Sequence, residues 1–274
     1  MSTRLGIVGT ESTHAAELIG YVAGRPDVTL AATLPGEGDP VAGVEAVGDI
    51  AALVDRVDAV AIFTRDARRH AELALHVLGA GLRVFVDKPL AAGTADAEAI
   101  LQAAAAGGGA VTSFSALRFL PVVAQWRAEV ELARAAGRLA EVGASGKAEP
   151  ASPYAGAWFY GVHTVELLAG FWADEVRVEA YGDRLLGQSS RAGIGCRLEW
   201  VDQPDAPFAL SWTGTDGTRH ETEVVTGSGY FDGAAAEILA FLTGGDPAVD
   251  TDGCRETVRV TETLVDAWRK AGRG

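Results

Sequence analysis

The amino-acid sequence predicts an α/β protein with two domains, a doubly wound parallel sheet followed by an α+β domain built on a mostly antiparallel sheet. In the first 116 residues, short apolar runs alternate with patterns of helical spacing. This alternation is typical of a parallel sheet whose two faces are both covered by helices. After residue 116, segments of period two follow one another with little helix between them, which favours antiparallel pairing. We therefore expect one domain at 1–116 and another at 117–274.

The elements expected in the first domain form a regular succession. Strands are predicted at 5–9, 28–34, 59–64, 83–86 and 110–114. Helices are predicted at 15–23, 49–54, 66–80 and 94–106, and the last of these stops at the glycine run 107–109. Because parallel strands are joined by right-handed crossovers, this order predicts a doubly wound sheet of the Rossmann type.

The second domain is expected to begin with one helix and continue with several strands. The helix is predicted at 121–136, and the strands at 139–145, 176–181, 193–200, 208–213 and 219–225. Turn residues at 205–207 and 215–217 join consecutive strands, as in antiparallel sheets. Helices at 231–242 and 253–271 end the chain, and the second of them is a candidate to pack back on the first domain.

Composition argues against several classes of function. Hydrophobic residues make up 48% of the chain, yet no stretch approaches the roughly 20 apolar residues that span a bilayer. Residues 1–4 lead directly into a strand, so we expect no export signal and a cytoplasmic location. Cys196 and Cys254 have no close spacing, which suggests neither a disulfide framework nor a zinc site. A formal net charge of −14 argues against nucleic-acid and membrane partners.

The turn after the first strand departs from a glycine-rich phosphate loop. It reads Gly9-Thr10-Glu11-Ser12-Thr13-His14, and only Gly6 and Gly9 remain of a glycine pattern. Glu11 would bring negative charge to the place where phosphates bind, whereas Ser12 and Thr13 can cap the helix or donate hydroxyl hydrogen bonds. A capped turn without a ligand is therefore an equal alternative.

The acid that usually holds the adenosine ribose is also missing from its expected place. The second strand ends in Thr33-Leu34-Pro35-Gly36, and the nearest acids are Glu37 and Asp39. Such acids are more often solvated loop charges. The residues alone leave NAD, NADP and no cofactor open.

Asp87-Lys88-Pro89 follows a strand at the edge where open α/β sheets bind ligands. A partly desolvated lysine beside a carboxylate can donate or accept a proton, or hold a substrate oxygen. The alternative is a surface lysine at the start of a loop. Because the chain has only two other lysines, Lys147 and Lys270, we favour a functional role for Lys88.

His163 and Glu166 are spaced to share one helix face, and a histidine is suited to proton transfer near neutral pH. A core histidine bonded to a backbone carbonyl is the alternative. Two such residues are too few for a metal site, so none is expected. The pattern assigns three other histidines to structure or to an exposed strand: His70, His76 and His220.

Together these segments resemble the Gfo/Idh/MocA family, named after glucose-fructose oxidoreductase and inositol dehydrogenase. The resemblance covers most of the chain and is carried by the opening strand at 6–9, the stretch from Asp58 through His70 to Asp87-Lys88-Pro89-Leu90-Ala91, Arg118-Phe119 with Pro121, Gly161-Val162-His163, and the closing segment 231–247. The lysine segment is the most specific of these.

The resemblance implies an NAD(P)-dependent oxidoreductase that moves hydride to or from an alcohol or imine of a small polar, sugar- or polyol-like substrate. It implies that Lys88 holds the reacting oxygen, that His163 relays the proton with help from Glu166, and that Arg118 or Tyr160 touches the substrate. The implied cofactor residues are Gly9, Thr10, Glu11, Ser12, Thr13, His14, Thr64, Arg65, His70, Asp87 and Lys88. It also implies a homodimer or homotetramer formed through the open face of the second sheet.

Two departures from the family keep other functions open. Many members carry an acid four residues before the histidine, where this chain has Phe159, and Glu11 stands in the glycine turn. The chain is also shorter than the usual member, which suggests a trimmed second sheet. The alternatives are a redox-neutral enzyme that uses Lys88 and His163 as acid and base, and a binding protein that has lost the cofactor. The enzyme hypotheses require both side chains to face one interdomain crevice.

Overall fold

The computed structural model describes residues 2–107 and 109–272, which form two compact units. The first unit runs to Phe114 and also contains Phe231–Arg255. The second comprises Ser115–Tyr230 and the chain from Glu256 onward. Residues 231–255, which the sequence assigned to the second domain, are thus grouped with the first unit. The functional roles given to the two domains stay a prediction.

Side chains of the parallel sheet hold the returning segment in the first unit. Arg83 Nη1 donates to the carbonyl oxygens of Phe241 and Gly245, each at 2.6 Å. Thr112 Oγ1 donates to the carbonyl of Val249 at 2.8 Å. These bonds join residues more than 130 positions apart, which local sequence patterns do not report.

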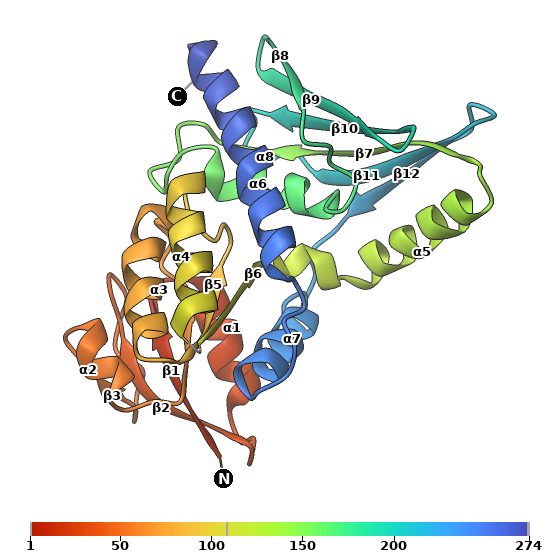
Figure 1. The fold of residues 1–274 in the computed structure, drawn as a ribbon. Helices are drawn as coiled ribbons and strands as arrows, with labels where there is room; N and C mark the ends of the chain where they lie inside the picture. Colours follow the sequence, from red (N-terminus) through yellow and green to blue (C-terminus); the bar gives the residue numbers. More distant parts are fainter. Residues whose placement is uncertain (1, 108, 273–274) are drawn as a thin grey trace. The chain divides into compact units, whose positions relative to one another are not determined.

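The first unit contains the predicted Rossmann-type sheet. Its strands are β1 (Thr3–Val8), β2 (Val28–Leu34), β3 (Glu45–Ala46), β4 (Ala59–Ile62), β5 (Arg83–Asp87) and β6 (Ala110–Phe114). All neighbours are parallel, in the order β3-β2-β1-β4-β5-β6 (Figure 1). The strand order reverses between β1 and β4, which creates the crevice where such sheets bind ligands. The short strand β3 was not expected.

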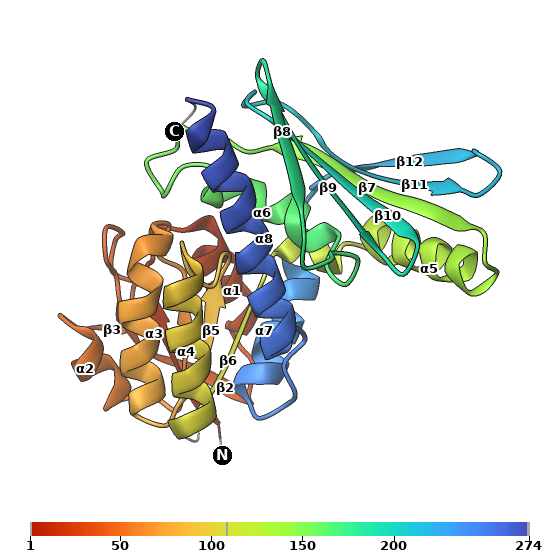
Figure 2. The same cartoon turned by 45° about the horizontal axis from the view of Figure 1, so that its top comes forward.

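Helices cover both faces of this sheet. They are α1 (Thr13–Val22), α2 (Ile50–Val54), the 3-10 turn η1 (Ala67–Arg69), α3 (His70–Gly79), α4 (Thr94–Gly107) and α7 (Asp232–Leu242). Figures 1 and 2 show α3 beside α4 on one face and α1 with α7 on the other. Because both faces are covered, all four residues of β4 are buried and apolar. Gly108, in the predicted glycine stop, lies outside the described residues.

The second unit contains the predicted, mostly antiparallel sheet. Its strands are β7 (Leu139–Lys147), β8 (Arg177–Tyr181), β9 (Arg184–Arg191), β10 (Ile194–Val201), β11 (Phe208–Gly214) and β12 (Arg219–Val224). Their order is β12-β11-β7-β10-β9-β8, and only the β7–β10 pair is parallel. The sequence did not predict β9. Its hairpin with β10 turns at Ala192 and Gly193, which have φ values of 52° and 81°.

Helices cover one face of the second sheet. They are the 3-10 turn η2 (Ala116–Phe119), α5 (Pro121–Ala135), α6 (Trp158–Leu167) and the part of α8 (Thr251–Lys270) that follows Arg255. Trp200 on β10 packs against Gly161 of α6, and Leu264 of α8 approaches Gly187 on β9. In the described residues, no helix has both the length and the apolar character needed to cross a membrane.

Candidate functional site

Gly9 brings the turn after β1 against the end of β4. Its φ is +84°, and a Cβ added there would lie 2.5 Å from the backbone nitrogen of Thr64. Only glycine tolerates both conditions at low cost. The carboxyl ends of β1 and β4 therefore meet closely at the switch point of the sheet.

The N-terminus of α1 opens at the same edge. Ser12 is its N-cap, and its Oγ accepts a hydrogen bond from the His14 backbone N–H at 3.2 Å. The first turn of α1 contains no acidic residue. Its N–H groups and helix dipole therefore suit an anionic group such as a phosphate.

The Glu11 carboxylate lies near the ends of β2 and β4. Its Oε1 accepts a hydrogen bond from the Arg65 backbone N–H at 3.3 Å. Its Oε2 is buried and has no hydrogen-bond partner among the residues that the structure describes, and it lies 3.3 Å from the position a Cβ would take on Gly36. Gly36 is the second residue after β2, so Glu11 brings an acceptor to the place where the sequence lacks an acid.

The loop after β2 lies over this turn. The Thr10 backbone N–H donates to the Pro35 carbonyl at 3.0 Å, and Thr10 Oγ1 donates to the Asp39 carbonyl at 2.7 Å. A Cβ on Gly38 would lie 2.4 Å from the Glu11 nitrogen. Carbonyls of the loop thus accept hydrogen bonds from the Thr10 N–H and hydroxyl, and the loop lies against Glu11.

His14 connects the turn after β1 to the end of β5. Its Nδ1 lies 3.0 Å from Asp87 Oδ2, and its ring stacks on Phe231 with centroids 4.9 Å apart. Burial alone would raise the pKa of the Asp87 carboxyl. The charge and hydrogen bond of His14, with the charges of Lys88 and His70, outweigh it and lower that pKa to about 2. Asp87 is therefore a carboxylate at neutral pH.

Lys88 directly follows β5 and has only 6% of its surface exposed. The sequence left open that Lys88 is a surface lysine at the start of a loop. Its burial is inconsistent with that alternative. A buried ammonium beside the Asp87 carboxylate has a compensating charge at hand. This arrangement suits a group that engages a ligand.

His70 is a buried side chain that connects the segments following β4 and β5. Its Nε2 lies 2.8 Å from the carbonyl oxygen of Thr64, and its Nδ1 lies 2.8 Å from the carbonyl oxygen of Pro89. The side chain is 1% exposed, and burial lowers the pKa of His70. This geometry favours a role in holding the two strand ends over direct contact with a cofactor.

In the second unit, His163 and Glu166 of α6 both bond to Ser115. His163 Nδ1 lies 2.6 Å from Ser115 Oγ, and Glu166 Oε2 accepts a hydrogen bond from the Ser115 backbone N–H at 2.7 Å. Glu166 is 2% exposed and His163 is 8% exposed. The structure therefore brings the two predicted residues together through a third that the sequence analysis missed. Ser115 is the N-cap of η2, so a search for helix caps would have marked it.

Two arginines surround the buried Glu166. Arg118 Nη1 lies 3.9 Å from Glu166 Oε2, and Arg127 Nη2 donates to the carbonyl of Leu167 at 3.2 Å. Burial, followed by the charge of Arg118, lowers the pKa of Arg127 to about 10. The Arg118 guanidinium thus lies beside the Glu166 carboxyl, and Arg127 holds the end of α6 through its carbonyls.

Tyr160 lies one turn before His163 on α6, and its ring centroid is 6.3 Å from that of His163. The ammonium of Lys147 sits 3.9 Å from the Tyr160 ring centroid, a cation–π contact. Phe159, which stands where many members of the family have an acid, packs its ring edge to face with Tyr160 at 4.7 Å. Phe159 therefore belongs to an aromatic cluster.

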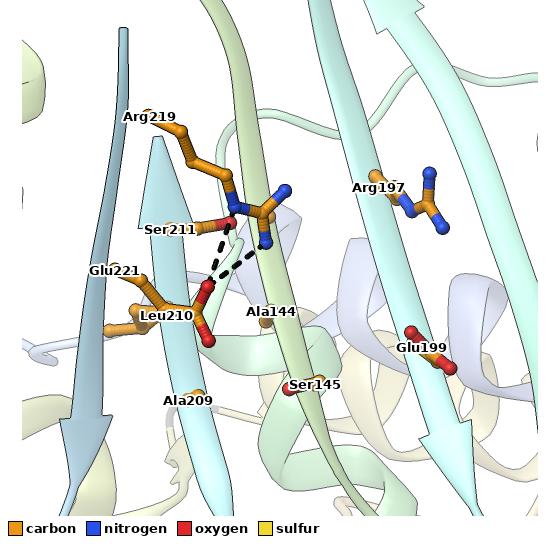
Figure 3. Close-up of a pocket in the computed structure, with 10 residues that line it drawn as sticks. Ala144, Ser145, Arg197, Glu199, Ala209, Leu210, Ser211, Arg219 and Glu221 are labelled. Carbon is orange, nitrogen blue, oxygen red and sulfur yellow. Dashed lines mark hydrogen bonds and ion pairs between the residues drawn. The ribbon is translucent and has the colours of Figure 1, made fainter. Parts of the chain in front are cut away.

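The other face of the second sheet carries a polar pocket. Figure 3 shows that Arg197, Glu199, Arg219 and Glu221 surround Ser145 and Ser211 there. Arg219 donates to Glu221 at 3.3 Å. This pocket lies opposite the face covered by α6, so it is separate from His163. Among the described residues, no group of three His, Cys, Asp or Glu side chains is arranged to hold a metal ion.

The predicted site residues thus form two groups. Lys88, Asp87, His14 and the turn residues belong to the first unit, whereas His163, Glu166, Arg118 and Tyr160 belong to the second. That Lys88 and His163 face one crevice stays a prediction.

Comparison with known proteins gives one family match, in the first unit. Residues 4–114 match the Gfo/Idh/MocA family model, described as an oxidoreductase family with an NAD-binding Rossmann fold. This match confirms the resemblance found in the sequence. The comparison with curated proteins found no match.

Solved structures share the fold over nearly the whole chain. A dehydrogenase from Chromobacterium violaceum has a TM-score of 0.78 at 18% identity, covering 99% of this chain and 97% of its own. Myo-inositol 2-dehydrogenase from Lactobacillus plantarum has a TM-score of 0.78 at 14% identity, covering 99% and 98%. GenD2 from gentamicin A biosynthesis, in complex with NAD, has a TM-score of 0.81 at 16% identity, covering 99% and 95%. At these identities the likeness is one of fold.

Proposed function

We propose that this chain is an NAD(P)-dependent dehydrogenase or reductase that moves hydride to or from a small polar substrate of the sugar, polyol or imine type. One observation carries the proposal. The buried Lys88 follows β5 at the same sheet edge as Gly9 and the α1 N-terminus, beside the switch point between β1 and β4. The NAD-binding family of residues 4–114 and the NAD complex of GenD2 support the choice of cofactor.

The residues at this edge fit a nicotinamide dinucleotide. Gly9 leaves room that a Cβ would fill, and the N–H groups at the start of α1 suit a pyrophosphate. Glu11 Oε2 is an acceptor without a partner near the β2 end, where a ribose hydroxyl is normally held. Such a dinucleotide supplies the hydride donor or acceptor.

Within this proposal, the side chains of the chain bind and orient the substrate. Lys88 holds and polarises the reacting oxygen, and the Asp87 carboxylate supplies the opposite charge beside it. His163 contacts the same oxygen from the second unit, with Glu166 placing it through Ser115. Arg118 and Tyr160 complete the substrate contacts, since both lie beside these groups.

A titration followed by one substitution tests the proposal. Isothermal titration with NAD+, NADH, NADP+ and NADPH should give saturable binding of at least one dinucleotide. Lys88→Ala should fold and bind that dinucleotide but lose most turnover in a nicotinamide-absorbance assay with a panel of polyols, sugars and imines. Lys270→Ala, at the end of α8, is the matched control. A Lys88→Ala protein with full turnover would end the assignment.

A redox-neutral enzyme is the second candidate, because the turn after β1 contains Glu11 and is bonded to the loop after β2, both of which disfavour binding of a dinucleotide phosphate there. The Thr10 N–H is bonded to the Pro35 carbonyl, so it is not available to a phosphate, and the Glu11 carboxylate adds negative charge to the turn after β1. In that case Lys88 and His163 act as acid and base, and product accumulates without a net change in nicotinamide absorbance. A protein that binds none of the four dinucleotides and turns over nothing would instead be a binding protein.

We further propose that the open face of the second sheet joins two copies of the chain. Its centre carries the small residues Gly143, Ser145, Ala209 and Ser211, flanked by the charges seen in Figure 3. Ala209→Arg should lower the mass measured by light scattering, whereas Leu132→Arg on the exposed side of α5 should not. An unchanged mass in Ala209→Arg would reject this face as the contact.

A further inference from the structure

The contact between Ser115 and His163 is short and buried. Ser115 is fully buried, and its Oγ lies 2.6 Å from His163 Nδ1. A hydroxyl carries one proton, so either the serine donates to Nδ1 or Nδ1 donates to the serine. The remaining contacts of Ser115 decide between these two directions.

Hydrogen-bond accounting assigns the shared proton to the serine. The backbone N–H of Leu117 already donates to Ser115 Oγ at 3.2 Å. Within the chain that the structure describes, the only other partner of this oxygen is His163 Nδ1. If Nδ1 also donated, the buried hydroxyl proton would have no acceptor, which is costly. Donation from Ser115 to Nδ1 gives both the hydroxyl proton and Nδ1 a partner.

The surroundings hold both residues in this arrangement. Glu166 Oε2 accepts from the Ser115 backbone N–H at 2.7 Å, which fixes the serine. Phe208 packs edge to face against the His163 ring at 5.5 Å. Trp200 Nε1 on β10 donates to the Gly161 carbonyl of α6 at 3.0 Å, which anchors the helix to the strand. The imidazole therefore has a defined orientation.

We propose that Ser115 is a positioning residue that keeps His163 neutral, with Nδ1 as an acceptor and the proton on Nε2. His163 then offers an N–H to the reacting oxygen of a substrate and does not take up its proton. This changes the role of proton relay that the family resemblance implied for His163. The proton-transfer role passes to Lys88. The part of this inference that concerns a substrate rests on the proposed function.

Histidine-selective 15N labelling and NMR near pH 8, where an exposed histidine with a pKa of about 6.5 is neutral, test the tautomer without any substrate. The chain has five histidines, which His→Gln variants assign. His163 should show an unprotonated Nδ1 and a protonated Nε2. His76 is an internal control, because its Nδ1 lies 2.9 Å from the Glu72 carbonyl. A carbonyl only accepts, so His76 should show the opposite tautomer. A protonated Nδ1 on His163 would overturn the inference.

Substitutions of Ser115 separate positioning from folding. Ser115→Ala should move the His163 signals toward a tautomer mixture, and Ser115→Thr, which keeps a hydroxyl, should restore the wild-type pattern. Unchanged His163 signals in a folded Ser115→Ala protein would also overturn the inference. If Ser115→Ala does not fold, the wild-type spectrum decides. Full turnover in His163→Ala would reject the proposed function while leaving the tautomer result intact.

Discussion

Nδ1 of His14 lies 3.0 Å from one oxygen of Asp87 and 3.1 Å from the other, which joins the turn after β1 to the end of β5. The residues are 73 positions apart in the chain, and both are largely buried. The bond places a carboxylate of unusually low pKa next to Lys88. It links the candidate cofactor turn directly to the candidate catalytic lysine.

This contact predicts a pH-dependent contribution to stability. The folded pKa of Asp87, about 2, is below the ordinary value of 3.8, so its stabilising effect is complete above pH 3.8 and is lost as the pH falls toward 2. A shift of this size corresponds to about 2 kcal/mol. In urea titrations, the difference in unfolding free energy between wild type and Asp87→Asn should have its full value near pH 5 and shrink below pH 3.8. A difference that does not change with pH would contradict the ion pair.

Gly9→Ala should destabilise the first unit strongly. A Cβ there would lie 2.5 Å from a backbone atom, at a φ of +84°. We expect a loss of about 3 kcal/mol in unfolding free energy. Gly24→Ala is the matched control, because its φ is +78° and nothing lies within 4 Å of the added Cβ. It should cost only about 1 kcal/mol. Equal losses in the two variants would show that the approach to Thr64 is unimportant.

Gly161→Ala should disturb both the stability and the position of His163. The added Cβ would lie 2.5 Å from Trp200 Cζ2, inside the contact that seats α6 on β10. Overpacking of this kind costs about 1–3 kcal/mol. Gly20→Ala, in α1 with nothing within 4 Å, should instead be neutral or stabilising by up to about 1 kcal/mol. Thermal unfolding measures both, and a neutral Gly161→Ala would mean that α6 can shift freely.

Glu11 should govern the choice between NAD and NADP. Its carboxylate near the β2 end favours ribose hydroxyls and repels a 2′-phosphate. We expect wild type to bind NAD+ more tightly than NADP+ by about tenfold or more, which is about 1.4 kcal/mol. Glu11→Gln should bring the two dissociation constants closer together, and Glu37→Gln in the exposed loop should not. An unchanged ratio in Glu11→Gln would remove Glu11 from this role.

Local patterns in the sequence were enough to predict most of the fold. Buried parallel strands such as β4 are short apolar runs, and a helix follows each run at regular spacing. This is why the doubly wound parallel sheet and the place of Lys88 after the fourth predicted strand, β5, followed from the sequence. The position of His163 on a helix followed from the spacing to Glu166 in the same way.

The features that escaped prediction depend on contacts between distant residues. The second half of β9 consists of four polar residues, from Gln188 to Arg191, and Gly187 precedes them, so its pattern is weak. Ser115 has meaning only because α6 brings His163 and Glu166 to it across some 50 residues. The direction of the Glu11 side chain depends in the same way on the loop after β2 and on Arg65.

The return of Phe231–Arg255 to the first unit has a consequence for biosynthesis. Phe231 stacks on His14 and packs against Phe63, so the last part of this unit is made long after its strands. A nascent chain must hold the six-stranded sheet partly uncovered while the ribosome adds the whole of 115–230. A protein truncated at residue 230 would retain Lys88 and His163 yet expose apolar surface around His14, making it a substrate for chaperones and proteases.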